Sequence, residues 1–336
     1  MTTSTVPREC TSTVVMTVRD EPLDRMRRAL RSVARQEDCG CIEVVIAAPS
    51  EDHAALRLLR PEGAIERITL VENLGGARSA GLNHAVHAAT ADVIVRVDAR
   101  SRLPHNYVAR CIDRLAEHAR VGVVGGRQSP QLQDSSRLAR GVARALSNRW
   151  LLGVPAYRDP DAGGSVDTVY LGAFRRRELL AVGGYDVGLD ANEDFDLCCR
   201  YRDAGLDVWL ERGLAVSYEP RSSIRAVFGQ YRSFGEAKVE FWRRTGRRPN
   251  RRQRAAMSAA VASVGIAAVA LPRPAHFVRL GLVGLAAIAI VDHVAEPTER
   301  DAGVRAWACA ASAALTSGWL IGIAQARLRA GRRRVR

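Results

Sequence analysis

The fold is decided by the stretch ENLGGARSAGLNHAVHAATADVIVRVDAR, residues 72–100. It begins with a polar, glycine-containing loop at 72–76, continues with a helical pattern over 77–89, and ends in the apolar run 92–97, which stops at Asp98. A loop, a helix and a short β-branched run are typical of the second half of a β-α-β unit. The stretch therefore predicts an α/β fold in which Asp98 directly follows a buried strand.

The same unit recurs toward the N-terminus. Three further short apolar runs, each followed by a polar loop and a helical pattern, occupy residues 13–18, 42–47 and 68–71. Strands that alternate with helices at this spacing predict a mostly parallel sheet with right-handed crossovers. Ligands of such sheets bind outside the carboxyl ends of the strands, which is where Asp20, Glu21 and Asp98 fall.

More elements follow before residue 245, where we expect the catalytic core to end. The stretch from the fifth strand to about residue 165 is polar and poorly patterned. The patterns predict strands at 121–126, 166–174, 208–210 and 215–218, and helices at 105–118, 176–181 and 192–204.

The positive charge is concentrated in two segments. The 336 residues carry a net charge of +14, but residues 221–254 alone hold eleven basic residues against two acids, and residues 327–336 hold six arginines and no acid. The rest of the chain is close to neutral. Nucleic-acid binding has only this charge in its favour.

The cysteines and the N-terminus exclude two further classes. Seven cysteines, an odd number without repeated CxxC spacing, indicate neither a disulfide framework nor a zinc site, so we expect reduced thiols. Residues 1–12 have no apolar core of the kind a signal peptide needs, and we expect a flexible tail there.

The last hundred residues differ in kind from the rest. Three apolar runs, 255–271, 277–291 and 306–324, are each close to the roughly 20 residues that a membrane-spanning helix needs. They predict a membrane anchor, and the alternative is an alanine-rich soluble helical hairpin. The positive-inside rule places both basic flanks in the cytoplasm and the acidic loop 292–305 outside. That requires an even number of crossings although three runs are visible, so two or three crossings remain open.

Two groups of acids are candidates for chemistry. Asp98 could hold a divalent cation through hard oxygen ligands, although aspartates at strand ends also cap helices and turns. Asn192-Glu193-Asp194-Phe195-Asp196 opens a predicted helix. Acids favour helix starts through the dipole alone, and the functional alternative is that one carboxylate takes a proton from an attacking hydroxyl.

Taken together, the motifs resemble glycosyltransferase family 2. VRDE at 18–21, the run 72–100 and Asn192-Glu193-Asp194 stand in the order of that family's motifs. The resemblance covers about 13–245 and is greatest to the succinoglycan-biosynthesis, ExoA-like branch, through VDTVYLGAFRR (166–176), GGYDVGLDANEDFDLCCRYRDAG (183–205) and PRSSIRAVFGQYRSFGEAK (220–238).

This resemblance implies a GT-A fold and inverting transfer of a sugar from a nucleotide sugar, most often a UDP-sugar. Asp194 would be the general base, and Glu193 would position it or the acceptor. Asp98 would bind Mg²⁺ or Mn²⁺. The other positions that carry over are the nucleotide-sugar pocket (Val18, Arg19, Glu21, Arg78, Asp98 and Arg100) and the acceptor side (Asp167, Gln230 and Tyr231).

The sequence departs from the family pattern at two places. The second strand ends in Ala47-Ala48-Pro49-Ser50, where the family usually has an aspartate that contacts the nucleobase, and Arg100 stands where the last acid of the DxD-type motif is usual. These changes favour the alternative of a catalytically weakened, GT-like membrane scaffold. The retained Asp98 and Asn192-Glu193-Asp194 favour the enzyme.

The basic segment 221–254 has two interpretations, a solvated face or a surface that holds the cleft against an anionic cytoplasmic leaflet. The second predicts a polyprenyl-diphosphate-linked glycan as acceptor and the cytoplasmic side of the cell membrane as location. The expected domain order is a GT-A domain at 13–245, a basic linker at 246–254, membrane-anchor helices at 255–326 and a basic tail at 327–336.

Overall fold

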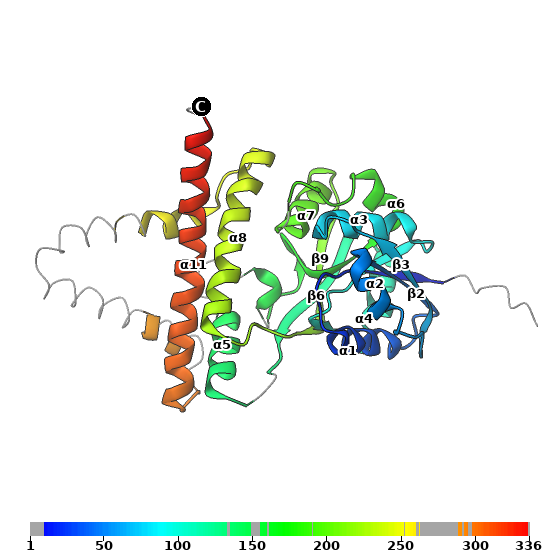
Figure 1. Ribbon diagram of the computed structural model, residues 1–336, viewed down its shortest axis with the longest axis horizontal. Coiled ribbons are helices and arrows are strands. Elements are labelled where there is room, and N and C mark those ends of the chain that lie inside the picture. The colour runs from blue at the N-terminus through cyan, green and yellow to red at the C-terminus, as the bar shows by residue number, and fades with distance from the viewer. Residues whose placement is uncertain are drawn as a thin grey trace, which may run out of the picture. The chain divides into compact units, whose positions relative to one another are not determined.

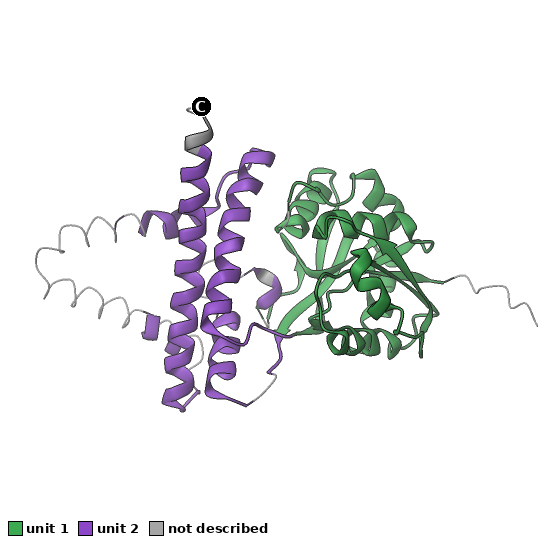
Figure 2. Ribbon diagram, in the orientation of Figure 1, with its two compact units in different colours: residues 1–129, 159–218 green, residues 130–158, 219–336 purple. Residues whose placement is uncertain are grey.

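The computed structural model describes residues 10–132, 135–148, 155–159, 161–189, 191–251, 253–259, 262, 288–290, 292–294 and 298–334. The chain divides into two compact units (Figure 2). The first unit comprises 1–129 and 159–218, and the second comprises 130–158 and 219–336.

The first unit is built on a mixed sheet that has nine strands in the described part of the chain, in the order β3-β2-β1-β4-β8-β6-β9-β5 with β7 beside β9. Four strands are parallel to one another: β3, β2, β1 and β4. The next strand, β8, pairs with β4 in the antiparallel direction. The bounds are β1 (Ser12–Thr17), β2 (Ile42–Ala48), β3 (Ile65–Glu72), β4 (Val93–Arg96), β5 (Ser101–Arg102), β6 (Val121–Pro130), β7 (Gly164–Ser165), β8 (Tyr170–Arg175) and β9 (Asp207–Tyr218).

Helices cover both faces of this sheet. Figure 1 shows α3, α6 and α7 on one face and α1 and α4 on the other. α1 packs through Met26, Ala29, Leu30 and Val33, which lie at helical spacing and are buried. The bounds are α1 (Leu23–Ala34), α2 (Ser50–Leu56), α3 (Arg78–Ala88), α4 (Tyr107–Glu117), α6 (Arg176–Ala181) and α7 (Glu193–Asp203), with a short 3₁₀ helix at Ala156–Arg158 in the second unit. This mixed α/β architecture confirms the predicted fold class.

A buried glutamate links the parallel strands. Glu43 on β2 accepts hydrogen bonds from the Thr13 hydroxyl at 2.7 Å, from the Thr90 amide at 2.9 Å and from Arg67 Nε at 2.9 Å. Burial by itself would raise the pKa of Glu43, but these hydrogen bonds outweigh it and hold the pKa below its usual value. The ionised carboxylate therefore holds together β1, β2, β3 and the segment that leads into β4.

One prediction of secondary structure was wrong, and one helix was not predicted. The two short strands expected at 208–210 and 215–218 are one strand, β9, which continues through charged residues because Glu211 is buried against Arg110 and Arg114. The polar, poorly patterned stretch before residue 165 contains a helix, α5 (Arg137–Ser147), which Ser136 caps by accepting from the Ala139 amide.

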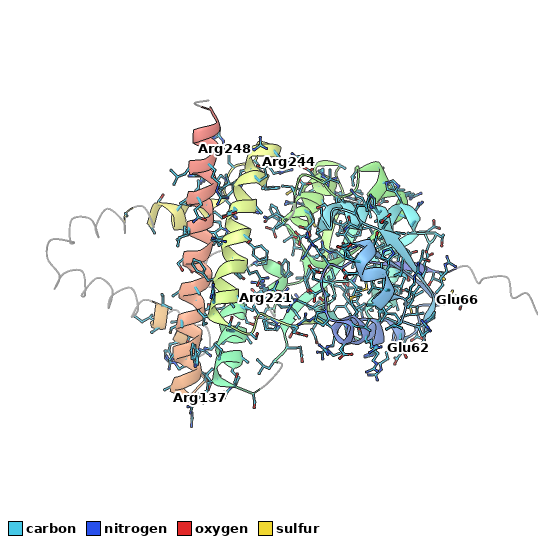
Figure 3. The ribbon with its side chains drawn as sticks, viewed as in Figure 1. Glu62, Glu66, Arg137, Arg221, Arg244 and Arg248 are labelled. Carbon is cyan, nitrogen blue, oxygen red and sulfur yellow. The ribbon has the colours of Figure 1, made fainter. Side chains whose placement is uncertain are left out.

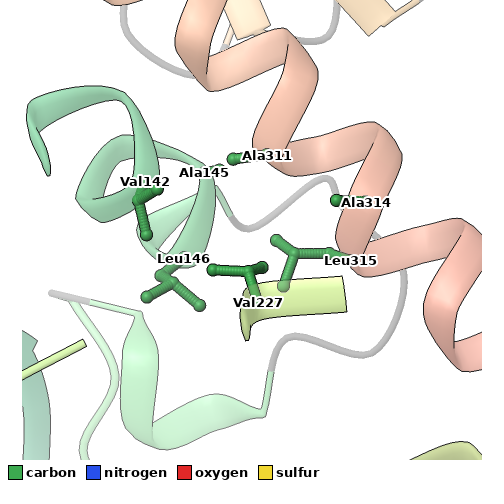
Figure 4. Close-up of a cluster of buried hydrophobic side chains, with 7 residues drawn as sticks. All are labelled: Val142, Ala145, Leu146, Val227, Ala311, Ala314 and Leu315. Atoms are coloured by element: carbon green, nitrogen blue, oxygen red, sulfur yellow. The ribbon is translucent and has the colours of Figure 1, made fainter. Parts of the chain in front are cut away.

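In the second unit, the three longest described helices pack together as a layer: α5, α8 (Ile224–Thr245) and α11 (Ala302–Arg334). They share the apolar cluster in Figure 4, which is made of Val142, Ala145, Leu146, Val227, Ala311, Ala314 and Leu315. α8 begins after Ser223, whose hydroxyl accepts from the Ala226 amide, and ends before Gly246 at a φ of 68°. Arg221 lies just before α8, Arg244 lies in its last turn and Arg248 follows it (Figure 3).

The structure describes only part of the three apolar runs. Most of 255–271 and 277–291 lies outside the described residues, whereas 306–324 lies within α11. Among the described residues, α11 is the one helix long and apolar enough to cross a membrane, over Ala302–Ala330, and 44% of its most apolar window is buried.

Candidate active site

The predicted donor residues gather at one edge of the sheet. β1 and β4 are parallel neighbours, so the residues that follow them, Val18 to Glu21 and Asp98 to Arg100, leave the sheet at the same edge. The Val18 amide donates to Ala47 O at 3.0 Å, which joins the end of β1 to the end of β2. The sequence thus predicted correctly that these segments lie at the carboxyl ends of strands, and the structure adds that the two strands are neighbours.

An ion pair joins the two segments. Arg100 Nε lies 3.6 Å from Glu21 Oε1, and Arg25 Nη1 donates to Glu21 Oε2 at 2.6 Å. Arg19 is exposed, and its side chain lies so close to Gly76 that a Cβ there would lie 2.7 Å from Arg19 Cδ. Gly76 has a φ of 60°, so the loop before α3 needs glycine both for its backbone conformation and for this approach.

Arg78 is the first residue of α3 and faces Asp98. Its Nη1 lies 3.8 Å from Asp98 Oδ2. The side chain of Asn73 donates to Ala77 O at 3.1 Å and so fixes the loop that leads into the helix. A helix start with an arginine in its first turn favours an anionic ligand group.

Arg96 is a residue of this site that the sequence reasoning missed. It ends β4, is 5% exposed, and donates from Nε to Asp98 Oδ1 at 3.1 Å and from Nη2 to Glu193 Oε1 at 3.0 Å. Its guanidinium carbon also lies 5.9 Å from the centre of the Tyr185 ring. The signal that could have found it is an arginine inside the apolar strand DVIVRV, since a buried charge needs partners.

The three acids at the start of α7 have three different surroundings. Glu193 is 3% exposed and bonded to Arg96, whereas Asp196 pairs with Arg200 four residues along the helix, at 2.8 Å. Asp194 is half-buried, and its Oδ1 accepts from the Phe195 amide at 2.8 Å. Asn192, just before the helix, has a φ of 65°, so the chain turns sharply before these acids.

The charges of the site shift two carboxylic acids in opposite directions. Burial alone would raise the pKa of Asp98, but the guanidinium groups of Arg96 and Arg78 outweigh it and hold this pKa below its usual value. Burial raises the pKa of Glu193 above its usual value, although Arg96 acts against the rise. Asp98 is therefore firmly ionised, and Glu193 depends on Arg96 for its charge.

The remaining predicted residues lie elsewhere in the chain. Asp167 is exposed, between β7 and β8 of the first unit. Gln230 and Tyr231 lie on α8 in the second unit, where the Tyr231 hydroxyl accepts from Arg158 Nη1 at 2.8 Å. At the other departure from the family pattern, Ala47 and Ala48 are fully buried at the end of β2.

The side chains of the site suit a divalent cation only if a bound ligand supplies further oxygen atoms. Among the described residues, no group of three or more histidine, cysteine or acidic side chains is arranged to hold a metal ion. Asp98 offers one carboxylate with 27% of its side chain exposed. Mg²⁺ is commonly held by one or two carboxylates together with substrate phosphates, so Asp98 fits such an ion when a diphosphate supplies further oxygens.

Comparisons with known proteins agree with this architecture. Succinoglycan biosynthesis protein ExoA of Rhizobium meliloti (strain 1021) is 27% identical over 202 residues, which span 59% of this chain and 60% of that protein. The structure of the mannosyltransferase PcManGT from Pyrobaculum calidifontis, in complex with GDP-Man and Mn²⁺, matches with a TM-score of 0.55 at 16% identity, over 96% of this chain and 89% of that one. This likeness identifies the fold as GT-A. The sequence profile of the glycosyltransferase-like family 2 matches residues 7–233, and the chain belongs to that family of glycosyltransferases.

Proposed function

We propose that the chain is an inverting glycosyltransferase that moves a hexose from a UDP-sugar to a hydroxyl of a lipid-linked glycan, in the synthesis of an exopolysaccharide or another cell-envelope glycan. The observation that carries the proposal is the pair of hydrogen bonds from Arg96, because they tie Asp98, at the predicted donor end, to Glu193 at the acidic start of α7. The name of the curated relative supports the exopolysaccharide part of the proposal.

Asp194 would act as the general base. A hydroxyl is a poor nucleophile at neutral pH, so an in-line displacement at the anomeric carbon needs a carboxylate on the face opposite the leaving nucleotide. Asp194 is half-buried and next to Glu193, whose side chain Arg96 fixes. In this role Asp194 takes the acceptor proton, while Glu193 and Arg96 keep the start of α7 in position.

Arg78 and Arg100 would stabilise the leaving diphosphate. Negative charge grows on it as the bond to the sugar breaks, and preorganised positive groups stabilise that charge. Arg78 is half-exposed beside Asp98, and Arg100 is held by Glu21. A divalent cation bound by Asp98 and the diphosphate would add a Lewis acid at the same place. Val18 and Arg19 would line the nucleoside part of the pocket.

The acceptor would reach the site from the membrane. Asp167, Gln230 and Tyr231 are its proposed contacts, and the basic segment 221–254 would hold the protein to an anionic cytoplasmic leaflet. A polyprenyl-diphosphate-linked glycan would arrive at that surface.

A donor screen tests the proposal. Membranes that contain the protein are supplied with a defined lipid-linked acceptor and with UDP-, GDP- or dTDP-sugars, each with and without Mn²⁺ or Mg²⁺. Transfer from a UDP-hexose with inversion at the anomeric carbon, faster to the lipid-linked glycan than to a soluble oligosaccharide, is the expected result. The absence of transfer from every donor would contradict it.

A further inference from the structure

α11 has the length and composition of a membrane-spanning helix, but its contacts are those of a helix packed against other helices of the protein. If it crossed the bilayer, its N-terminal end near Asp301 and its C-terminal end near Arg329 would lie on opposite sides. Two sets of contacts in the second unit bear on this, one with α5 and one with α8.

The acidic segment before α11 is bonded to α5. Three arginines on one face of α5 each bind an acid: Arg144 Nε donates to Asp292 Oδ1 at 2.6 Å, Arg140 Nη2 to Glu299 Oε2 at 2.7 Å and Arg137 Nε to Asp301 Oδ2 at 3.2 Å. The first pair is buried, with Asp292 only 1% exposed. Breaking a buried pair of this kind is strongly destabilising, because either charge alone would be left without a partner.

The position of α5 in the chain fixes its side of the membrane. α5 lies in the chain between β6 and β7, two strands of the catalytic sheet. The acidic segment before α11 is bonded to α5, so it lies on the same side of the membrane as the catalytic sheet. The interpretation from charge alone, which placed 292–305 across the membrane from the basic flanks, is incompatible with these three ion pairs.

α11 also packs closely along α8. A Cβ on Gly322 would run into the carbonyl oxygen of Arg232, one on Gly318 would lie 2.7 Å from the carbonyl oxygen of Phe228, and one on Gly235 of α8 would run into the carbonyl oxygen of Trp319. Backbones this close need glycine at the crossing. The two helices therefore share one environment over several turns.

That environment cannot be hydrocarbon, because α8 is charged where the helices meet. Arg232, Glu236 and Lys238 lie in its middle, and Arg329 of α11 reaches Glu236 at 3.5 Å. Charged side chains at the centre of a bilayer are costly. α8 also begins only six residues after the end of β9, so the chain has no room to cross a membrane between them.

We infer that α11 does not cross the membrane but stays on the side that holds α5, α8 and the catalytic sheet, as the third helix of a packed layer. This inference adds a membrane topology to the proposed function, and it rests on the membrane attachment proposed there. The acidic segment 292–301 then lies on the same side.

Cysteine accessibility in intact cells tests this inference. Three exposed positions of the full chain are changed singly: Leu58→Cys in the catalytic unit, Arg300→Cys before α11 and Leu328→Cys near its end. A membrane-impermeant maleimide is added to intact cells and, separately, after permeabilisation. The wild-type chain gives the background of its seven native cysteines.

The inference expects all three variants to behave alike, and with a cytoplasmic catalytic unit none is labelled above background until permeabilisation. Labelling of positions 300 and 328 from opposite sides would overturn it. Labelling of all three in intact cells would uphold it and contradict only the cytoplasmic side given in the proposed function. Recovery of the chain in the soluble fraction would remove the attachment on which the inference rests and so overturn it.

Discussion

Arg96 and Glu193, 97 residues apart in the chain, form a buried ion pair in which Nη2 donates to Oε1 at 3.0 Å. The same guanidinium donates to Asp98. One buried cation thus serves two carboxylates that come from different elements, the end of β4 and the start of α7.

Replacement of Arg96 tests how far this pair holds the site together. Arg96→Met leaves Glu193 buried without its partner, which should cost about 3–5 kcal/mol of unfolding free energy. Adding Glu193→Gln should restore more than half of the loss. Urea unfolding of the purified chain measures both variants. Arg120→Met, at a largely exposed arginine whose ion pair spans 4.0 Å, is the control and should change stability by less than about 0.5 kcal/mol. Equal effects of the two arginine variants would show that the buried pair has no special role.

Arg78 should contribute to donor affinity. If it binds the diphosphate, Arg78→Met removes a charge-assisted hydrogen bond and should weaken binding of a nucleoside diphosphate about 10- to 100-fold. Calorimetric titration with UDP, in the presence of Mn²⁺, measures this change. Arg177→Met, at an exposed arginine on α6, should leave the affinity unchanged. An unchanged affinity in Arg78→Met would exclude Arg78 from the donor site.

Two glycines on the α8–α11 pair should respond oppositely to alanine. Gly322→Ala places a methyl group against the carbonyl of Arg232 and should destabilise the second unit by about 1–3 kcal/mol. Gly229→Ala, on α8, meets nothing within 4 Å and should stabilise the helix by about 0.5–1 kcal/mol. Thermal unfolding in detergent compares the two, and shifts of the same sign would contradict the close crossing of these helices.

Glu43 should make the stability of the first unit depend on pH. Because its pKa is lowered in the folded protein, its contribution is fully present above the unfolded pKa, and it is lost as the pH falls through the folded value. Glu43→Gln should cost about 2–4 kcal/mol at pH 7 and flatten the loss of stability below about pH 5. Glu66→Gln, at an exposed position on β3, is the matched control (Figure 3) and should keep the wild-type pH profile. A Glu43→Gln profile parallel to the wild type from pH 7 to pH 3 would refute this role.

The sequence predicted most of the first unit because its signals are local. The β-branched runs and helical spacing identified β1, β2 and β4 to within two residues at either end. Strand-end positions also placed Asp98 and Glu21 at one edge of the sheet correctly. β9 was divided in two because Glu211 breaks its apolar pattern, and only the distant Arg110 and Arg114 explain why that acid is buried.

What the sequence could not supply was pairing between distant charges. Neither Arg96 nor Glu193 shows in its local sequence which residue it pairs with, and their ion pair forms only when α7 packs at the end of β4. In the second unit, the acids of 292–301 were assigned by charge balance to a loop outside the membrane. Their partners on α5 lie in a stretch of chain that shows no clear pattern.

The most direct test of the central claim compares sugar transfer by the wild type and by Asp194→Asn in the same membranes, with one donor and one lipid-linked acceptor. Asp203→Asn, at an exposed acid near the end of the same helix, is the control. The account predicts that Asp194→Asn binds the nucleotide sugar as the wild type does but transfers it about 10²- to 10⁴-fold more slowly, whereas Asp203→Asn keeps full activity. Transfer by Asp194→Asn at the wild-type rate would contradict it.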